Sequence, residues 1–295
     1  MSLDAESLIR QLEATGDYRV LRRFAPRERY GEAGPGGVRQ GLVVDVETTG
    51  LDPVADAIIE LAAVPFTFSP ADGVVIAVEP PATWLEDPGR PIPREVVELT
   101  GITQEMVAGQ RIDDAAATAL VERADLVIAH NAAFDRKFLN RRLPACAQKP
   151  WACSQREIPW KREVGASAAL EFLLVKHAGM FFQGHRAAVD CQALVHLLAT
   201  PLASGGTPLR WLLESARRAT VRIWAVDAPY DAKDALKTRG YSWNGGGDGR
   251  PKAWFREVPK EDLEAEKAWL AANAYGGRPG NPRVDPLTAR NRYSE

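Results

Sequence analysis

The chain is organised around residues 43–50, which read Val-Val-Asp-Val-Glu-Thr-Thr-Gly. The run that begins at Gly41 is apolar and rich in β-branched residues, which is typical of a buried strand. Because alternate side chains of a strand point to one face, we expect Asp45 and Glu47 to lie side by side. Neighbouring carboxylates repel and are costly to desolvate unless a cation or water reaches them. The octet therefore predicts either a site for a hard divalent cation or a strand with a wet polar face.

Length and composition indicate a globular protein with a substantial core. A chain of 295 residues favours one larger domain and one smaller domain, and 45% hydrophobic and 26% charged residues are ordinary values. The cysteines, at positions 146, 153 and 191, are odd in number and lack metal-type spacing, so neither a disulfide framework nor a zinc site is predicted. No signal-peptide pattern and no apolar run of about 20 residues is present, so we expect a cytoplasmic protein without a membrane span.

The net charge of -2 is unevenly distributed along the chain. Residues 205–295 carry 16 Lys and Arg against 12 Asp and Glu, and the rest of the chain has an acidic excess. The acidic excess of residues 1–204 is compatible with a carboxylate metal site. The basic excess of residues 205–295 is compatible with a nucleic-acid partner.

The first 39 residues are expected to form a helical extension and a linker. Apolar residues recur with helical spacing at Ala5, Leu8, Ile9 and Leu12. A second short helix is predicted around residues 18–24. Residues 25–40 are rich in Arg, Gly and Pro, which is typical of a linker, so the first helices are predicted to be an appendage.

The following segment predicts an α/β domain at residues 40–204. After the Asp45 strand, apolar runs at 58–68 and 74–78 are joined by turn residues and predict an antiparallel meander. Helical patterns follow at 94–99, 103–109 and 113–123. A second buried strand is predicted at 125–129.

Two further acidic segments follow that strand. Asp135 opens a helix just past the strand, at the edge where α/β sheets build their sites, although Asp in a first helical turn commonly stabilises only the helix dipole. His185 lies on a loop before an apolar helix that carries Asp190 in its first turns. His177 and His196 have no acidic neighbours at matching spacing, so we interpret them as packing residues.

Together, Asp45-x-Glu47, Asp135 and His185-x₄-Asp190 resemble the three exonuclease motifs of the DnaQ-like superfamily, in its DEDDh branch. They occur in the order of that family. The stretches Asp-Ala-Ile-Ile-Glu-Leu-Ala at 56–62, Leu-Thr-Gly-Ile-Thr at 99–103 and His-Asn-Ala-Ala-Phe-Asp at 130–135 are also similar to the family. The resemblance covers about residues 40–200 and neither end of the chain.

The resemblance implies a ribonuclease-H-like fold, in which helices flank a mixed five-stranded sheet, and 3′-to-5′ exonuclease activity. It implies four metal ligands, Asp45, Glu47, Asp135 and Asp190, and a general base, His185. Four carboxylates can hold two divalent cations, Mg²⁺ or Mn²⁺, about 4 Å apart around a scissile phosphate. Histidine, with a reference pKa near 6.5, can accept a proton from the attacking water at neutral pH.

The resemblance also implies a binding site for the 3′-terminal nucleotide. It assigns this role to the residues directly after the first ligands, which are Thr48, Thr49, Gly50 and Leu51, with Leu51 against the base. Asn131 and Phe134 are candidates to shape the pocket. A loop cap and a core aromatic residue are equally good interpretations of these two.

Residues 205–275 predict a small α+β domain that holds five of the eight tryptophans. Alternation places Arg222 and Trp224 on one strand face, and Lys252, Trp254 and Arg256 on one face of another. Aromatic residues interleaved with cations are typical of a platform that stacks single-stranded bases. Packing of the tryptophans under a helix is the favoured alternative. Residues 276–295, rich in Gly, Pro and Arg, are predicted to be disordered.

Three functions are compatible with these patterns. The first is a DNA 3′-to-5′ exonuclease of proofreading or repair type, like the epsilon subunit of bacterial DNA polymerase III, with a single-stranded 3′ end as substrate and a polymerase or repair complex as candidate partner. The second is an RNA-trimming exonuclease of the same branch. The third is a non-catalytic nucleic-acid-binding module, against which the intact set of five residues argues. DNA is favoured over RNA, although no sequence feature separates them.

Overall fold

A computed structural model describes residues 4–34, 36–247 and 249–294. Residues 1–3 and 35 of the predicted extension and linker, residue 248 of the predicted small domain and residue 295 of the predicted tail lie outside the described residues. The chain divides into two compact units, of which the second is Arg217–Asn291 and the first comprises the remainder. The predicted boundary at residue 205 differs because helix α11 (Pro208–Arg217) buries Leu209 and Leu212 in the core of the first unit.

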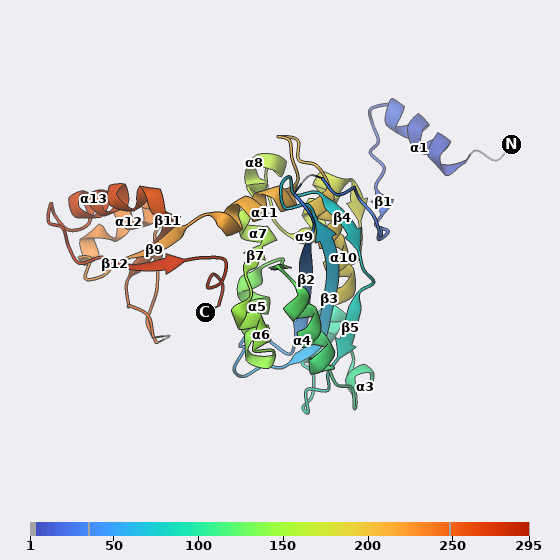
Figure 1. The fold of residues 1–295 in the computed structure, drawn as a ribbon, viewed down its shortest axis with the longest axis horizontal. Coiled ribbons are helices and arrows are strands. Elements are labelled where there is room, and N and C mark those ends of the chain that lie inside the picture. The colour runs from blue at the N-terminus through green and yellow to red at the C-terminus, as the bar shows by residue number, and fades with distance from the viewer. Residues whose placement is uncertain (1–3, 35, 248, 295) are drawn as a thin grey trace. The chain divides into compact units, whose positions relative to one another are not determined.

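The first unit is built on a mixed sheet with the strand order β4-β3-β2-β6-β7 (Figure 1). The central strand β2 is antiparallel to β3 and parallel to β6, which confirms the predicted α/β sheet. A further strand, β5, pairs with β3, and neither β5 nor β7 was predicted from the sequence. The strands span Arg39–Thr48 (β2), Ile58–Phe68 (β3), Val75–Val78 (β4), Ala82–Leu85 (β5), Leu126–Ala129 (β6) and Trp151–Cys153 (β7).

Helices cover both faces of this sheet. Alternate side chains of β2 point to opposite faces, and both sets include apolar residues that need to be buried. Val43 faces a core that includes the apolar side of α10, whereas Val44 faces a core formed with α4 and α5. The helices span Arg94–Thr100 (α2), Gln104–Val107 (α3), Asp114–Arg123 (α4), Ala132–Arg142 (α5), Ala145–Gln148 (α6), Ser154–Glu157 (α7), Trp160–Val164 (α8), Leu170–Leu173 (α9), Leu174–Ala178 (η1) and Ala187–Ala199 (α10). No described helix is long and apolar enough to cross a membrane.

The N-terminal segment differs from its prediction. Helix α1 (Ala5–Ala14) forms as expected, but the predicted second helix is wrong. Strand β1 (Arg22–Arg23) stands there instead and runs parallel to β8 (Met180–Phe181). Phe24 is buried in the core, and the Tyr30 hydroxyl lies 3.0 Å from Nδ1 of His196 on α10. Because these aromatic side chains find buried partners, residues 22–30 belong to the first unit and are not a detached appendage.

The second unit contains a four-stranded sheet in the order β10-β11-β9-β12. Ile223, Leu236, Tyr241 and Leu270 form its core between the sheet and the helices. The strands span Thr220–Ala225 (β9), Ser242–Trp243 (β10), Trp254–Pro259 (β11) and Arg283–Leu287 (β12), and the helices Tyr230–Ala232 (η2), Lys233–Arg239 (α12), Lys260–Asp262 (η3) and Leu263–Asn273 (α13). The predicted small α+β fold therefore forms.

The favoured interpretation of the C-terminal tryptophans, packing, is confirmed for Trp224, which is fully buried and donates a hydrogen bond to Asp285 at 2.7 Å, so the stacking platform fails there. Arg222 bonds Glu257 at 2.8 Å and is not a free cation. The predicted disorder from residue 276 is also wrong, because β12 pairs with β9 and the Tyr293 hydroxyl donates a hydrogen bond to Glu157 at 3.0 Å.

The close packing of β2 on β3 predicts that Gly41 tolerates no side chain. An added Cβ would overlap the ring of Phe66, which is its fully buried partner in the register. We expect Gly41→Ala to lower the free energy of unfolding by about 1–3 kcal/mol, the usual cost of overpacking. Denaturant unfolding measures this change. Gly245→Ala, where the added Cβ meets open space, is the control, and equal stabilities of the two variants would contradict the packing.

Candidate active site

Three of the predicted ligands meet at one end of β2. Asp45 and Glu47 share the strand face of Val43, and Asp190 comes from the first turn of α10, which covers that face. One carboxylate oxygen from each of these three residues lies within 4.8 Å of the others. The structure therefore brings together acidic side chains that are far apart in the sequence. Such a set of oxygen atoms could hold a metal ion.

Asp135 reaches the same strand from the opposite layer. It lies in the first turn of α5, is 2% exposed, and accepts a hydrogen bond from the backbone N–H of Val46 at 3.1 Å. Val46 stands between Asp45 and Glu47 in the strand. Asp135 is not a member of the group within 4.8 Å, so its carboxylate is placed beside the cluster and held there by β2.

The four carboxylates all have raised pKa values. Burial, followed by the charge of Asp135, raises the pKa of Asp45 well above its ordinary value. Burial, followed by the charge of Asp190, raises the pKa of Glu47 to about 8. Burial also raises the pKa of Asp135 to about 7 and that of Asp190 to about 6, against hydrogen bonds that lower both. Positive charge placed among these groups would stabilise the ionised carboxylates and so lower the pKa values that burial raises.

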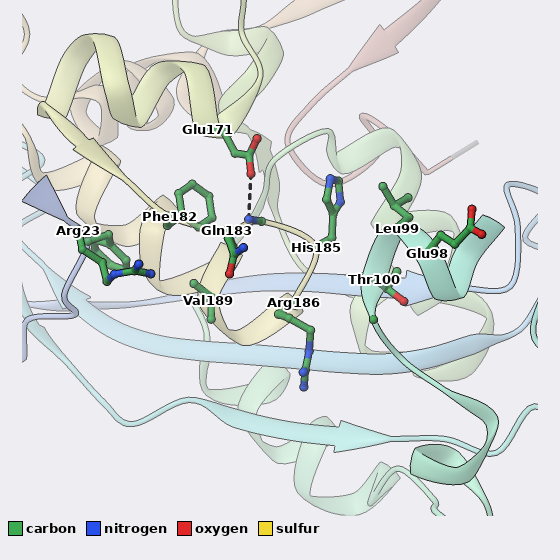
Figure 2. Close-up of a pocket in the computed structure, with 13 residues that line it drawn as sticks. Arg23, Glu98, Leu99, Thr100, Glu171, Phe182, Gln183, His185, Arg186 and Val189 are labelled. Carbon is green, nitrogen blue, oxygen red and sulfur yellow. Dashed lines mark hydrogen bonds between the residues drawn. The ribbon is translucent and has the colours of Figure 1, made fainter. Parts of the chain in front are cut away.

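His185 lies on the loop before α10, where the side chain is exposed and the backbone φ is 65°. The loop is held on both sides of the histidine: the Gly184 N–H donates to Glu171 at 2.9 Å, and the Arg186 N–H donates to Asp190 at 3.0 Å. Figure 2 shows the His185 ring projecting from the loop between Glu171 and Leu99. The structure therefore places His185 next to the acidic cluster without making it a member.

Glu60 is a site residue that the sequence reasoning missed. It is 1% exposed on β3 and lies opposite Glu47 in the register. One carboxylate oxygen accepts the Ala187 N–H at 3.0 Å, and the other pairs with Arg186 at 3.2 Å. Glu60 therefore anchors the start of α10, which carries Asp190. Its signal in the sequence is a lone charge within the apolar run 58–68.

The turn after Asp45 and Glu47 is held by side-chain hydrogen bonds and ends in an exposed apolar side chain. The Thr49 hydroxyl donates to Asp56 at 3.1 Å and accepts a hydrogen bond from Arg90 at 2.6 Å. A Cβ at Gly50 would collide with Asp56. Leu51, which follows, is 84% exposed. The Thr48 hydroxyl donates to the Gly50 carbonyl at 2.5 Å. Binding of the terminal nucleotide by residues 48–51 stays a prediction.

The remaining predicted residues have structural contacts. Asn131 adopts φ 83° at the start of α5, and the ring of Phe134 packs 5.0 Å from that of Phe138. Phe134 therefore packs as a core aromatic would, whereas Asn131 stands at the N-cap of α5 without a capping hydrogen bond from its side chain. The two histidines interpreted as packing residues also have internal partners, because His177 bonds the Thr200 carbonyl at 3.0 Å and His196 contacts Tyr30.

The sequence model of the exonuclease family, RNase_T, matches residues 42–198, more than half of the chain. The chain therefore belongs to the exonuclease family, and its resemblance to DnaQ-like exonucleases is confirmed.

Several curated relatives are polymerases. A DNA polymerase III of PolC type from Clostridium perfringens is 33% identical over 153 residues, which cover 50% of this chain and 10% of that protein. The corresponding protein of Thermotoga maritima is 34% identical over 159 residues, covering 53% of this chain and 10% of its own length. The chain thus spans about a tenth of the length of these relatives.

A solved structure of exonuclease I from E. coli, in a zinc-bound complex with single-stranded DNA, has a similar fold. Its TM-score is 0.51 at 15% sequence identity, and the match covers 81% of this chain and 69% of that one. At this identity the likeness supports the fold alone.

The raised pKa values predict how pH changes the stability of the metal-free protein. The four carboxyl groups keep their protons in the folded state up to their raised pKa values, whereas the unfolded chain releases them near pH 4. Their contribution to the free energy of unfolding is therefore fully present below about pH 4 and is lost as pH rises through the folded pKa values. Burial lowers the pKa of His130 and His196 to about 4. Below about pH 6.5 the unfolded chain protonates these histidines first, so their contribution makes stability rise with pH and opposes that of the carboxyl groups. We therefore expect the melting temperature to fall between about pH 6.5 and pH 8, where Asp135 and Glu47 ionise.

Calorimetry with a chelator, with Mg²⁺ and with Mn²⁺ tests this prediction. Either ion should offset the fall, and Asp45→Asn should reduce both the fall and the offset. A melting temperature independent of pH and metal would contradict the cluster. Glu264→Ala, which removes an 81% exposed carboxylate side chain in the second unit, is the control for a general change of charge.

Proposed function

We propose that the chain is a metal-dependent exonuclease that hydrolyses phosphodiester bonds from the 3′ end of a DNA strand. The observation that carries this proposal is the convergence of Asp45, Glu47 and Asp190 within 4.8 Å in a member of the exonuclease family. Asp135 contributes the fourth carboxylate through its contact with β2.

The four carboxylates fit two Mg²⁺ or Mn²⁺ ions. Ionised Asp and Glu offer only hard oxygen acceptors, which suit these cations, and burial leaves their mutual repulsion uncompensated. Bound ions would supply Lewis-acid stabilisation of charge on the scissile phosphate and lower the pKa of a bound water. Asp45, Glu47 and Asp190 would hold the ions from one side, and Asp135 would complete the set of four ligands.

His185 is the proposed general base. It stands on the anchored loop that precedes Asp190, and its exposed imidazole can accept a proton from water. Glu171, Asp190 and Glu60 hold this loop by backbone hydrogen bonds, so the base is presented from a fixed segment. Thr48–Leu51 are the proposed contacts to the terminal nucleotide, with the exposed Leu51 against its base.

DNA is the proposed substrate because the relatives at 33% and 34% identity are DNA polymerases. A single-stranded 3′ end is the proposed form of the substrate, and a polymerase or a repair complex is the proposed partner. RNA trimming is the alternative, and contacts to the 2′-hydroxyl would decide between the two.

Digestion of matched single-stranded DNA and RNA, each labelled at the 5′ or the 3′ end, tests this function. With Mg²⁺ or Mn²⁺ we expect DNA to shorten from its 3′ end, with immediate release of a 3′ label and none with a chelator. Asp45→Ala and Asp135→Ala should abolish the activity, whereas Glu264→Ala should not. Preferential RNA shortening would favour the alternative substrate, and wild-type rates in both Asp variants would refute the metal site.

His185→Ala tests the general base. We expect turnover to fall by about 10²- to 10⁴-fold with little change in KM, because a positioned base acts mainly in the transition state. The residual rate should also lose the dependence on pH that histidine ionisation produces. Normal turnover with a raised KM would instead assign His185 to substrate binding.

A further inference from the structure

A cavity of about 670 Å³ opens beside the His185 loop within the first unit (Figure 2). Its walls come from the end of α2, the loop before α10 and the strand β1. The lining residues used below are Arg23, Glu98, Leu99, Glu171, Phe182 and Arg186. Because the cavity begins at the proposed general base, a strand that ends at the carboxylate cluster can continue into it.

Arg23 enters this cavity from outside the region that the exonuclease family model matches, residues 42–198. Its backbone is fixed by pairing with β8, in which Arg23 lies opposite Phe181. The next residue, Phe24, donates its N–H to the Phe181 carbonyl at 2.9 Å and is 8% exposed in the core. The N-terminal segment therefore holds Arg23 at the cavity by a hydrogen-bonded ladder and a buried ring.

The other charges of the cavity are already engaged. Glu98 pairs with Arg94 at 2.7 Å, and Glu171 accepts the Gly184 N–H at 2.9 Å. Arg186 pairs with the buried Glu60. Arg23 makes no ion pair with a described carboxylate, and its guanidinium lies 5.1 Å from the centre of the Phe181 ring. It is thus available to an anion from outside the protein.

The remaining surface of the cavity suits the uncharged part of a nucleotide. Leu99 is 57% exposed, and Phe182 is partly buried beside Phe24, so apolar side chains stand on two sides. Figure 2 shows Leu99 and Phe182 on opposite sides of the His185 loop, with Arg23 beyond Phe182. A cavity of mixed lining, with apolar side chains on two sides and a cation from β1, matches the sugar, base and phosphate of a strand.

We infer that Arg23 binds a backbone phosphate of the substrate strand, upstream of the 3′ end that lies at the carboxylate cluster. The N-terminal segment is then part of the substrate groove. A guanidinium recognises a phosphate with two parallel hydrogen bonds, which a compact ammonium cannot reproduce. The inference rests on the proposed function, because it requires a nucleic-acid strand whose end reaches His185.

Binding of a fluorescent single-stranded DNA to the full chain tests the inference, with Asp45→Ala in every protein to prevent cleavage. We expect Arg23→Ala to weaken binding by about 5- to 20-fold and to reduce the slope of log K against log salt by about 0.7, the loss of one phosphate contact. Arg23→Lys should keep the slope. Arg22→Ala is the matched control, since the neighbouring Arg22 pairs with Glu6 at 2.6 Å, and it should change binding less than about twofold.

Cleavage by proteins with an intact Asp45 separates the possible failures. Arg23→Ala should raise KM with kcat unchanged, because the contact is equal in ground and transition states. The inference fails and the proposed function stands if the protein with wild-type Arg23 degrades DNA but Arg23→Ala leaves the binding affinity unchanged, or weakens it no more than Arg22→Ala does. If only inhibition by a released nucleoside monophosphate changes, Arg23 holds product and the inference also fails. If the parent protein degrades no strand, the proposed function itself fails.

Discussion

Repulsion between partly buried carboxylates is the constraint on which the candidate site depends. The central strand places Asp45 and Glu47 on one face, and α10 brings Asp190 against them, so burial and like charge raise their pKa values together. A fold that only had to be stable would place apolar side chains there, as β2 does at Val43 and Val44. Uncompensated buried charge is costly, and it persists where a ligand of opposite charge is part of the function.

The surrounding shell shows how the chain keeps this arrangement in place. Glu60 receives the first N–H of α10 and the Arg186 guanidinium, which fixes the helix that carries Asp190. Asp135 is tied to the backbone of β2 through Val46. Hydrogen bonds to main chain and an ion pair therefore position Asp135 and the start of the helix that carries Asp190.

Sequence patterns predicted the parts of the fold that depend on local periodicity. The alternation at 43–47 and the apolar run 58–68 indicated β2 and β3, and the spacing of His185 and Asp190 indicated the start of α10. The patterns failed where strands pair over long distances in the sequence. Arg22 and Arg23 form a strand because they pair with β8, which lies far along the chain. The C-terminal tail is ordered because its strand β12 pairs with β9. Glu60 was missed because its partners, Arg186 and Ala187, are distant in sequence.

The central claim is that the carboxylate cluster binds the divalent cations that hydrolysis requires. Anomalous diffraction from crystals of the protein grown with Mn²⁺ tests it most directly, because it locates the metal independently of activity. We expect an anomalous peak within coordination distance of Asp45, Glu47 and Asp190, and its loss in crystals of Asp45→Asn. Manganese peaks only at other carboxylates, or none at saturating Mn²⁺, would contradict it.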